Sequence, residues 1–270
     1  MSYICVMRFF SFFLALFLFF SCSQYREYQK VIKSTDVDLK YNKAFEYYNT
    51  QDYVRALQLF EDLLPYFKGD SKAEELYYKY IYCNYFVEDY ISTAYHAKNF
   101  TSKFMLSLKN EEMAFLSAYC YYLDSPRSSL DQQNTYKAIN ELESFLMNYP
   151  GSDSVKTINN LIFNLNEKLQ KKYFEIVTSY YNRGRFKSAI HAIESYIVEF
   201  PETIFLEEVK FTQLKAYYEL GKNSIDQKKE QRIKEAIFAC DDFLITFPNG
   251  SFNEEVMSIY QKLKYIENGL

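Results

Sequence analysis

A repeated helical pattern constrains this chain more than any other feature of its sequence. Residues 138–150, 189–201 and 236–248 superimpose without gaps. Each segment begins with alanine, has an apolar residue four positions later and an aromatic residue seven positions later, and ends in an aromatic-proline pair. Spacings of four and seven place side chains on one helix face, and a proline ends a helix. Each segment is therefore predicted to be a helix whose alanine lets a neighbouring helix approach closely.

A fourth copy of this pattern begins at Ala56 but has Lys68 in place of the closing proline. A partner helix precedes these segments, and the pattern of residues 44–56 recurs 37 positions later, including an Asp-Tyr pair at the turn between the two helices. Two helices joined by a short turn in this way resemble the tetratricopeptide repeat. The sequence thus predicts an all-α, tetratricopeptide-like solenoid of about five helical hairpins.

The composition agrees with long helices and excludes several other classes. Six glycines and five prolines in 270 residues are too few for a glycine-rich phosphate loop, a dinucleotide fingerprint or the frequent turns of a β-sandwich. A formal net charge of -4 gives no electrostatic footprint for nucleic acid. We therefore expect a helical protein that does not bind DNA or RNA.

The amino terminus has the features of a bacterial lipoprotein signal. Residues 9–20 are apolar except for one serine, and this run is too short to span a bilayer, which takes roughly 20 apolar residues. Ser21 directly before Cys22 resembles a lipobox, whose cysteine is diacylated after cleavage. We expect a signal peptide over residues 1–21 and a covalent lipid such as palmitate on Cys22, with no other cofactor. The alternative is an ordinary secreted protein in which Cys22 is incidental.

The rest of the chain is predicted to have three parts. A linker follows Cys22 over residues 22–37, repeats one to three occupy residues 38–152, and residues 153–270 hold a long helix followed by repeats four and five. The long helix is expected between Gly151 and Gly184, where there is no glycine or proline, and would be about 45 Å long. Repeats three and five are expected to contain longer connections, near residues 125–135 and 224–232.

The remaining cysteines and the histidines do not indicate a chemical site. Cys83, Cys120 and Cys240 lie among apolar residues in helical patterns, so we expect them to be small buried side chains. A disulfide between Cys83 and Cys120 is the alternative. The two histidines, His96 and His191, lie far apart and lack an H-E-x-x-H context, so no metal site is expected.

The combination of a lipobox cysteine, a short polar linker and five such repeats resembles the BamD family of outer-membrane lipoproteins. Residues 130–152, LDQQNTYKAINELESFLMNYPGS, are similar to that family's third repeat, and residues 180–224 to its fourth and fifth. The resemblance implies a lipid-anchored scaffold on the periplasmic face of the outer membrane, within the machine that assembles β-barrel proteins. It also implies that the N-terminal repeats contact unfolded barrel precursors and that the C-terminal repeats hold the periplasmic domains of the BamA subunit.

Aromatic residues recur at positions i, i+4 and i+7 in the first helix of repeats one to three. That helix normally lines the concave face of a helical-repeat solenoid. The candidate peptide-binding residues are Tyr41, Phe45, Tyr48, Tyr78, Tyr82, Tyr85, Phe115, Tyr119 and Tyr122. Such rings offer a large contact area at low entropic cost, and tyrosine adds a hydroxyl for peptide backbone. A groove lined in this way would suit an extended segment with aromatic side chains; the alternative is that the rings pack between helices.

The sequence offers little support for an enzyme or a glycan-binding protein. Glutamate pairs recur at positions 74-75, 111-112, 207-208 and 254-255, near predicted helix starts, where they favour the helix dipole. There is no G-x-S-x-G nucleophile motif and no tryptophan to serve as a sugar platform. The open alternative to the assembly scaffold is another periplasmic tetratricopeptide-repeat lipoprotein that scaffolds envelope-maintenance complexes.

Overall fold

The fold is all-α, as the sequence predicts. The computed structural model describes residues 25–269, and the backbone in this range forms helices, turns and loops with no strand. The chain divides into two compact units. Unit 1 holds the described residues up to Ser125 together with Asn134–Ile158, and unit 2 holds Pro126–Gln133 with the residues from Asn159 onwards. The predicted signal peptide and the lipobox cysteine lie outside the described residues.

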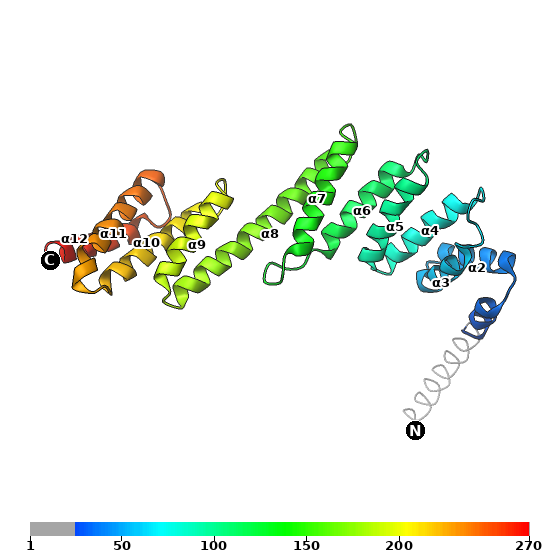
Figure 1. Ribbon diagram of the computed structural model, residues 1–270, viewed down its shortest axis with the longest axis horizontal. Coiled ribbons are helices and arrows are strands. Elements are labelled where there is room, and N and C mark those ends of the chain that lie inside the picture. The colour runs from blue at the N-terminus through cyan, green and yellow to red at the C-terminus, as the bar shows by residue number, and fades with distance from the viewer. Residues whose placement is uncertain (1–24, 270) are drawn as a thin grey trace, which may run out of the picture. The chain divides into compact units, whose positions relative to one another are not determined.

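Unit 1 contains the first three helical hairpins. Their helices are α2 (Val37–Asn49) with α3 (Tyr53–Leu63), α4 (Ala73–Phe86) with α5 (Tyr90–Lys103), and α6 (Asn110–Asp124) with α7 (Gln133–Asn148). Figure 1 shows each pair as two antiparallel helices, coloured from blue to green along the chain. The hairpins correspond to predicted repeats one, two and three.

The turn between the two helices has the same backbone geometry in three hairpins, and this geometry explains why Gly184 lies where it does. The second residue after the first helix has a positive φ in each case, 63° at Gln51, 63° at Glu88 and 69° at Gly184. The next amide N–H donates to a carbonyl five residues earlier, as at the C-terminus of many helices. Asp52 and Asp89 then cap the second helix with their side chains. Repeats one, two and four therefore share a turn that glycine adopts without strain.

The residues of the repeat signature form the core. Ala56, Phe60 and Leu63 of repeat one are 0% exposed. Their counterparts in repeats three to five are at most 3% exposed: Ala138, Leu142, Phe145, Ala189, Ile193, Tyr196, Ala236, Cys240 and Phe243. Each fully buried large side chain contributes roughly 2 kcal/mol through removal of apolar surface from water. The recurring spacing thus marks the side chains that hold each hairpin together.

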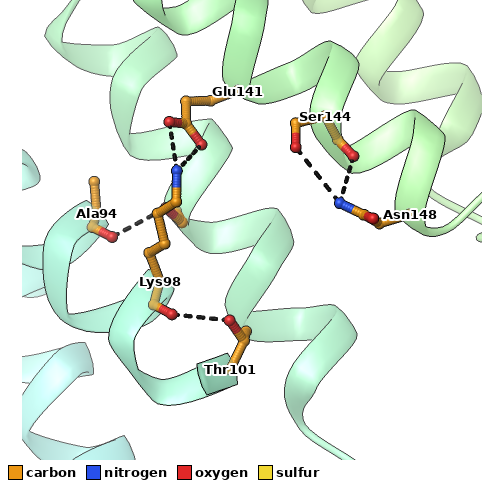
Figure 2. A network of polar contacts seen from close by, with 7 residues as sticks. Ala94, Lys98, Thr101, Glu141, Ser144 and Asn148 are labelled. Carbon is orange, nitrogen blue, oxygen red and sulfur yellow. Dashed lines mark hydrogen bonds and ion pairs between the residues drawn. The ribbon is translucent and has the colours of Figure 1, made fainter. Parts of the chain in front are cut away.

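Neighbouring repeats are also joined on the side of their second helices. Lys98 of α5 reaches Glu141 of α7, with its ammonium 2.7 and 2.9 Å from the two carboxylate oxygens (Figure 2). Beside it, the Ser117 hydroxyl of α6 donates to the carbonyl of Ala94 in α5 at 3.0 Å. The Lys98 side chain is 59% exposed and that of Glu141 21%, so the ion pair is partly open to solvent and adds little stability. It links the second helices of repeats two and three directly.

Part of the predicted linker is a helix rather than a polar tether. Residues 25–33 are helical, and Tyr28 and Val31 are buried in the core of repeat one. The Tyr28 hydroxyl donates to the Gln58 side chain of α3 at 2.7 Å. The sequence did not indicate this helix, because the segment is short and has few apolar residues at helical spacing. The chain is therefore attached to repeat one within a few residues of position 22.

Unit 2 begins within a long helix. Helix α8 (Val155–Asn182) has 28 residues and is about 42 Å long, which confirms the predicted long helix. It is followed by α9 (Phe186–Glu199), α10 (Leu206–Lys222), α11 (Asp226–Thr246) and α12 (Asn253–Glu267). Helices α8 and α9 form repeat four, and α10 and α11 form repeat five. Helix α12 then covers the apolar side of repeat five with Val256, Ile259 and Leu263.

The helices end before the closing prolines as predicted, but one of the two predicted long connections is mostly helical. Helices α7, α9 and α11 each end two residues before the proline of their segment. The long connection of repeat three is present over residues 125–132. In repeat five, however, α11 already begins at Asp226, so most of residues 224–232 are helical. This segment lacks glycine and proline and is stabilised by a Glu230–Lys234 ion pair at 2.6 Å.

The three cysteines of the repeats are free and buried, which excludes the alternative disulfide. Burial raises the pKa of the thiols of Cys83, Cys120 and Cys240 to about 12, so they stay protonated. All four glutamate pairs lie in the first turns of helices, α4, α6, α10 and α12, as predicted. Within residues 25–269, no helix is both long and apolar enough to cross a bilayer.

Candidate peptide-binding face

The nine aromatic residues predicted to bind peptide all lie in unit 1, on the first helix of each hairpin. Three come from α2, three from α4 and three from α6. All nine are half-buried: each packs on neighbouring side chains and keeps part of its surface exposed. Together we call these nine residues the aromatic face. The sequence left open whether these rings form a binding surface or pack between helices. In the structure every ring does both in part, because one portion is packed and another is exposed.

The rings of α2 rest on the second helix of their own repeat. Tyr41 and Phe45 have centroids 4.7 Å apart, and Phe45 meets the buried Phe60 edge-on at 5.3 Å. Tyr48 contacts Phe60 at 6.2 Å and Tyr53 at 5.6 Å. Burial raises the pKa of the Tyr48 phenol to about 12. The hydroxyl is therefore neutral at physiological pH and able to donate a hydrogen bond.

A shared carboxylate joins the rings of α4 to α6. The hydroxyls of Tyr78 and Tyr82 both donate to one oxygen of Glu112, at 2.8 and 2.5 Å. Burial, and next the Glu112 carboxylate, raise the pKa of Tyr78 to about 12, and the same two causes raise that of Tyr82. The sequence placed Glu112 only at a helix start. Its link to two tyrosines depends on the packing of repeat two against repeat three, which no local pattern reveals.

The rings of α6 continue the face. Phe115 and Tyr119 are stacked at 5.8 Å with an interplanar angle of 7°, and Tyr119 and Tyr122 at 6.0 Å with 12°. Tyr85 of α4 lies near Tyr119, and its pKa is raised by burial and then by that neighbouring phenol. The rings of α6 therefore lie beside those of α4.

Three lysines, which the sequence prediction missed, lie over rings of this face. The ammonium of Lys72 is 4.8 Å from the Tyr41 centroid, that of Lys79 is 4.4 Å from Tyr48, and that of Lys109 is 4.3 Å from Tyr78. Such cation–π contacts hold a positive charge at an aromatic surface. The face thus offers rings for apolar side chains, neutral hydroxyls for peptide carbonyls and cations for carboxylates. These are the groups needed to bind a peptide, and no catalytic step follows from them.

The family of the chain is shown by its sequence. Residues 34–233 match the YfiO family, described as outer membrane lipoprotein. The chain belongs to this family. YfiO and BamD denote the same family, so the resemblance stated from the sequence is confirmed. The YfiO match begins just before α2 and ends within α11, and it therefore includes the whole aromatic face. No curated protein matches the chain significantly.

Solved structures with similar arrangements of helices are tetratricopeptide-repeat proteins. A TPR repeats protein from Bacteroides fragilis is 14% identical, with 86% of this chain and 100% of that chain covered and a TM-score of 0.37. The TPR domain of P58(IPK) is 14% identical, with 89% and 58% covered and a TM-score of 0.40. The TPR2AB domain of yeast Sti1, in a complex with pHSP90, is 13% identical, with 84% and 98% covered and a TM-score of 0.40.

Proposed function

We propose that this lipoprotein is a scaffold of the machine that assembles outer-membrane β-barrels. Its aromatic face would bind unfolded barrel precursors, and repeats four and five would hold the periplasmic domains of the BamA subunit. The observation that carries the proposal is a set of nine half-buried aromatic residues on the first helices of three successive repeats in a member of the YfiO outer membrane lipoprotein family.

The geometry of the aromatic face suits an extended chain. Alternate side chains of a strand are about 6.6 Å apart. Successive rings of α4 are separated by comparable distances, 4.9 Å between Tyr78 and Tyr82 and 6.3 Å between Tyr82 and Tyr85. Strands of barrel proteins alternate apolar and polar side chains, with aromatic residues at the membrane interfaces. Rings that accept alternate apolar side chains, with hydroxyls between them, match this pattern.

The lipid on Cys22 would place repeat one close to the membrane. Only two residues separate Cys22 from the first described residue, and residues 25–33 form a helix whose Tyr28 and Val31 are buried against repeat one. A lipid anchor at this position is therefore followed by almost no flexible chain. Several acyl chains, at about 0.8 kcal/mol per buried CH₂, would retain the protein at the bilayer.

Repeat five offers a surface for a folded partner domain. A hollow of about 870 Å³ lies between α10 and α11 and is lined by both charged and aromatic side chains. Lys210 and Asp242 form an ion pair at 2.9 Å across it, and Phe238 is 72% exposed. A large aromatic side chain surrounded by polar groups is typical of an interface centre. We assign the contact with BamA to this hollow.

The proposed function is tested by purification of the tagged full chain from membranes, followed by mass spectrometry. We expect a large barrel protein with periplasmic repeat domains to co-purify. The substitution Phe238→Asp should reduce its recovery at least about tenfold, because a carboxylate would replace the exposed ring at the interface centre. Phe163→Asp, at a ring of α8 that is 56% exposed, is the matched control. Reproducible absence of such a partner from the wild-type sample would contradict the proposal.

A further inference from the structure

Repeats one and two lack the closing aromatic-proline pair, and a cavity lies between them. Phe67-Lys68 and Phe104-Met105 occupy the positions that the later repeats fill with an aromatic residue and proline. Helix α3 ends at Leu63, two residues before Pro65, and a connection of nine residues leads to α4. The cavity measures about 250 Å³ and lies between this connection, the start of α4 and the end of α5. The departure from the repeat pattern thus coincides with an opening in the structure.

The walls of this cavity are apolar. Leu76 and Tyr77 are buried at its base, and Leu64, Phe67 and Phe104 are half-buried around it. Its volume is smaller than that of most sites for small organic ligands, which run from about 300 to 1,000 Å³. It is large enough for one leucine or phenylalanine side chain. The cavity is therefore of a size to anchor a single residue of a partner.

Two lysines at the mouth have no carboxylate partner. Lys68 and Lys103 line the cavity and are exposed, and neither forms an ion pair with any residue in the described range 25–269. The ammonium of Lys103 lies 4.9 Å from the centroid of Tyr77. The nearby Asp70 carboxylate is occupied locally, accepting hydrogen bonds from the Lys72 amide at 2.8 Å and the Ser71 hydroxyl at 3.4 Å. A cationic mouth above an apolar base favours a ligand that combines an apolar group with an anion.

The loop after Phe104 extends this apolar surface into solvent. Met105, Leu106 and Leu108 are 78%, 99% and 102% exposed. Neighbouring apolar side chains that are so fully exposed mark interaction surfaces in soluble proteins. Since both this loop and the connection from α3 adjoin the cavity, a bound segment has further protein surface next to its anchor.

We propose that this cavity docks an internal peptide segment of a partner protein, with a bulky apolar side chain in the cavity and an adjacent acidic side chain paired with Lys68 and Lys103. An internal segment is favoured over a chain end because apolar surface continues past the cavity. A membrane surface is disfavoured because binding to anionic lipid uses clusters of about four to eight basic residues, and two surround this mouth. The cavity lining contains none of the nine rings of the aromatic face, although Phe67 of its wall contacts Tyr41 of that face at 5.4 Å.

The test uses the full chain in detergent and labelled peptides of known sequence. The probe is a 12-residue Gly/Ser peptide with blocked ends and a central Phe-Asp pair, and its affinity is measured by fluorescence anisotropy. We expect binding with Kd below about 1 mM, and at least about tenfold weaker binding when Phe is replaced by Ala or Asp by Lys. The double substitution Lys68→Glu and Lys103→Glu should reverse this preference, so that the Phe-Lys peptide binds better than the Phe-Asp peptide.

Two further variants and one control complete the experiment. Ala73→Leu, which adds a side chain at the cavity wall, should weaken the Phe-Asp peptide at least about tenfold without a change of charge. Lys30→Glu with Lys33→Glu, the same charge change on exposed residues of the first helix, should leave the affinity within twofold. Binding of a barrel-precursor peptide to the aromatic face should also stay within twofold in the Lys68/Lys103 variant, which separates this proposal from the proposed function.

Several outcomes would overturn the proposal. These are equal affinity for all three central pairs, no binding at 1 mM, or tighter binding of a peptide that ends in phenylalanine with a free carboxylate. If the peptides fail to bind while the chain binds to itself, and Ala73→Leu abolishes that self-association, the cavity belongs to a second copy. If the chain instead binds phosphatidylglycerol vesicles and Ala73→Leu abolishes that binding, the cavity belongs to lipid.

Discussion

Replacement of Tyr78, Tyr82 and Tyr85 by alanine is expected to weaken binding of a barrel-precursor C-terminal peptide by about 100-fold. These three residues lie at the centre of the aromatic face, between the rings of α2 and α6. Aromatic side chains at the centre of an interface dominate its affinity, and about 100-fold corresponds to about 2.7 kcal/mol. Fluorescence anisotropy with a labelled peptide measures the change. Circular dichroism should show unchanged helicity, because all three side chains are half-buried rather than fully buried.

A matched control and a milder variant separate the contributions of the tyrosine rings and hydroxyls to peptide affinity. Tyr25, Tyr66 and Tyr95 are 57%, 69% and 61% exposed in the same unit and outside the aromatic face, so their replacement by alanine should leave the affinity within twofold. Phenylalanine at positions 78 and 82 keeps the rings but removes the hydroxyls that donate to Glu112, and should cost about fivefold or less. Unchanged affinity in a folded triple-alanine variant would rule out the aromatic face as the peptide site.

Phe100→Ala is expected to destabilise unit 1 by about 3 to 5 kcal/mol. Phe100 is 0% exposed and supports the aromatic residues of α4: its centroid is 6.2 Å from Tyr77 and 6.5 Å from Tyr78, and 4.9 Å from Phe104. Alanine would leave a cavity beneath them that the rigid hairpin cannot fill. Hydrogen exchange of the amides of α4 and α5 should therefore become at least about 100-fold faster.

The control for this substitution is Phe238→Ala, which removes the same atoms from a ring that is 72% exposed. It should change the stability by less than about 1 kcal/mol. Amides of α10 to α12 should exchange at the wild-type rate in the Phe100 variant, because unit 2 has its own core. Equal destabilisation by the two substitutions would contradict the assignment of Phe100 to the core of repeat two.

The periodic parts of this molecule could be predicted from its sequence, because their determinants are local. Alanine at the first position of the signature is 0% exposed in repeats one, three, four and five, since only a small side chain permits close approach of two helices. Proline ends a helix by its own geometry, so the ends of α7, α9 and α11 followed directly. The aromatic face was predicted for the same reason, since a spacing of i, i+4 and i+7 fixes a helix face without reference to neighbours.

The polar partners of the face could not be predicted in this way. Glu112 lies 34 residues from Tyr78 and 30 from Tyr82, and the two meet only because repeat two packs on repeat three. The position of Lys109 over Tyr78 depends on the same packing, and that of Lys72 over Tyr41 depends on the packing of repeat one against repeat two. The start of α11 is not marked by an apolar stripe: its first residues are polar, although they are good helix formers and include no glycine or proline. The repeat pattern thus encodes neither the interactions between repeats nor the helices that lack an apolar stripe.

Photocrosslinking from the aromatic face tests the central claim most directly. A benzoylphenylalanine is placed at Tyr82 on the face, and at Tyr95 on α5 as the control, in tagged full chains expressed in cells. The account predicts ultraviolet-dependent crosslinks from position 82 to unfolded outer-membrane barrel proteins and at least about tenfold fewer from position 95. Equal crosslinking from the two positions, or none from position 82 while BamA still co-purifies, would contradict the role of the aromatic face in binding precursors.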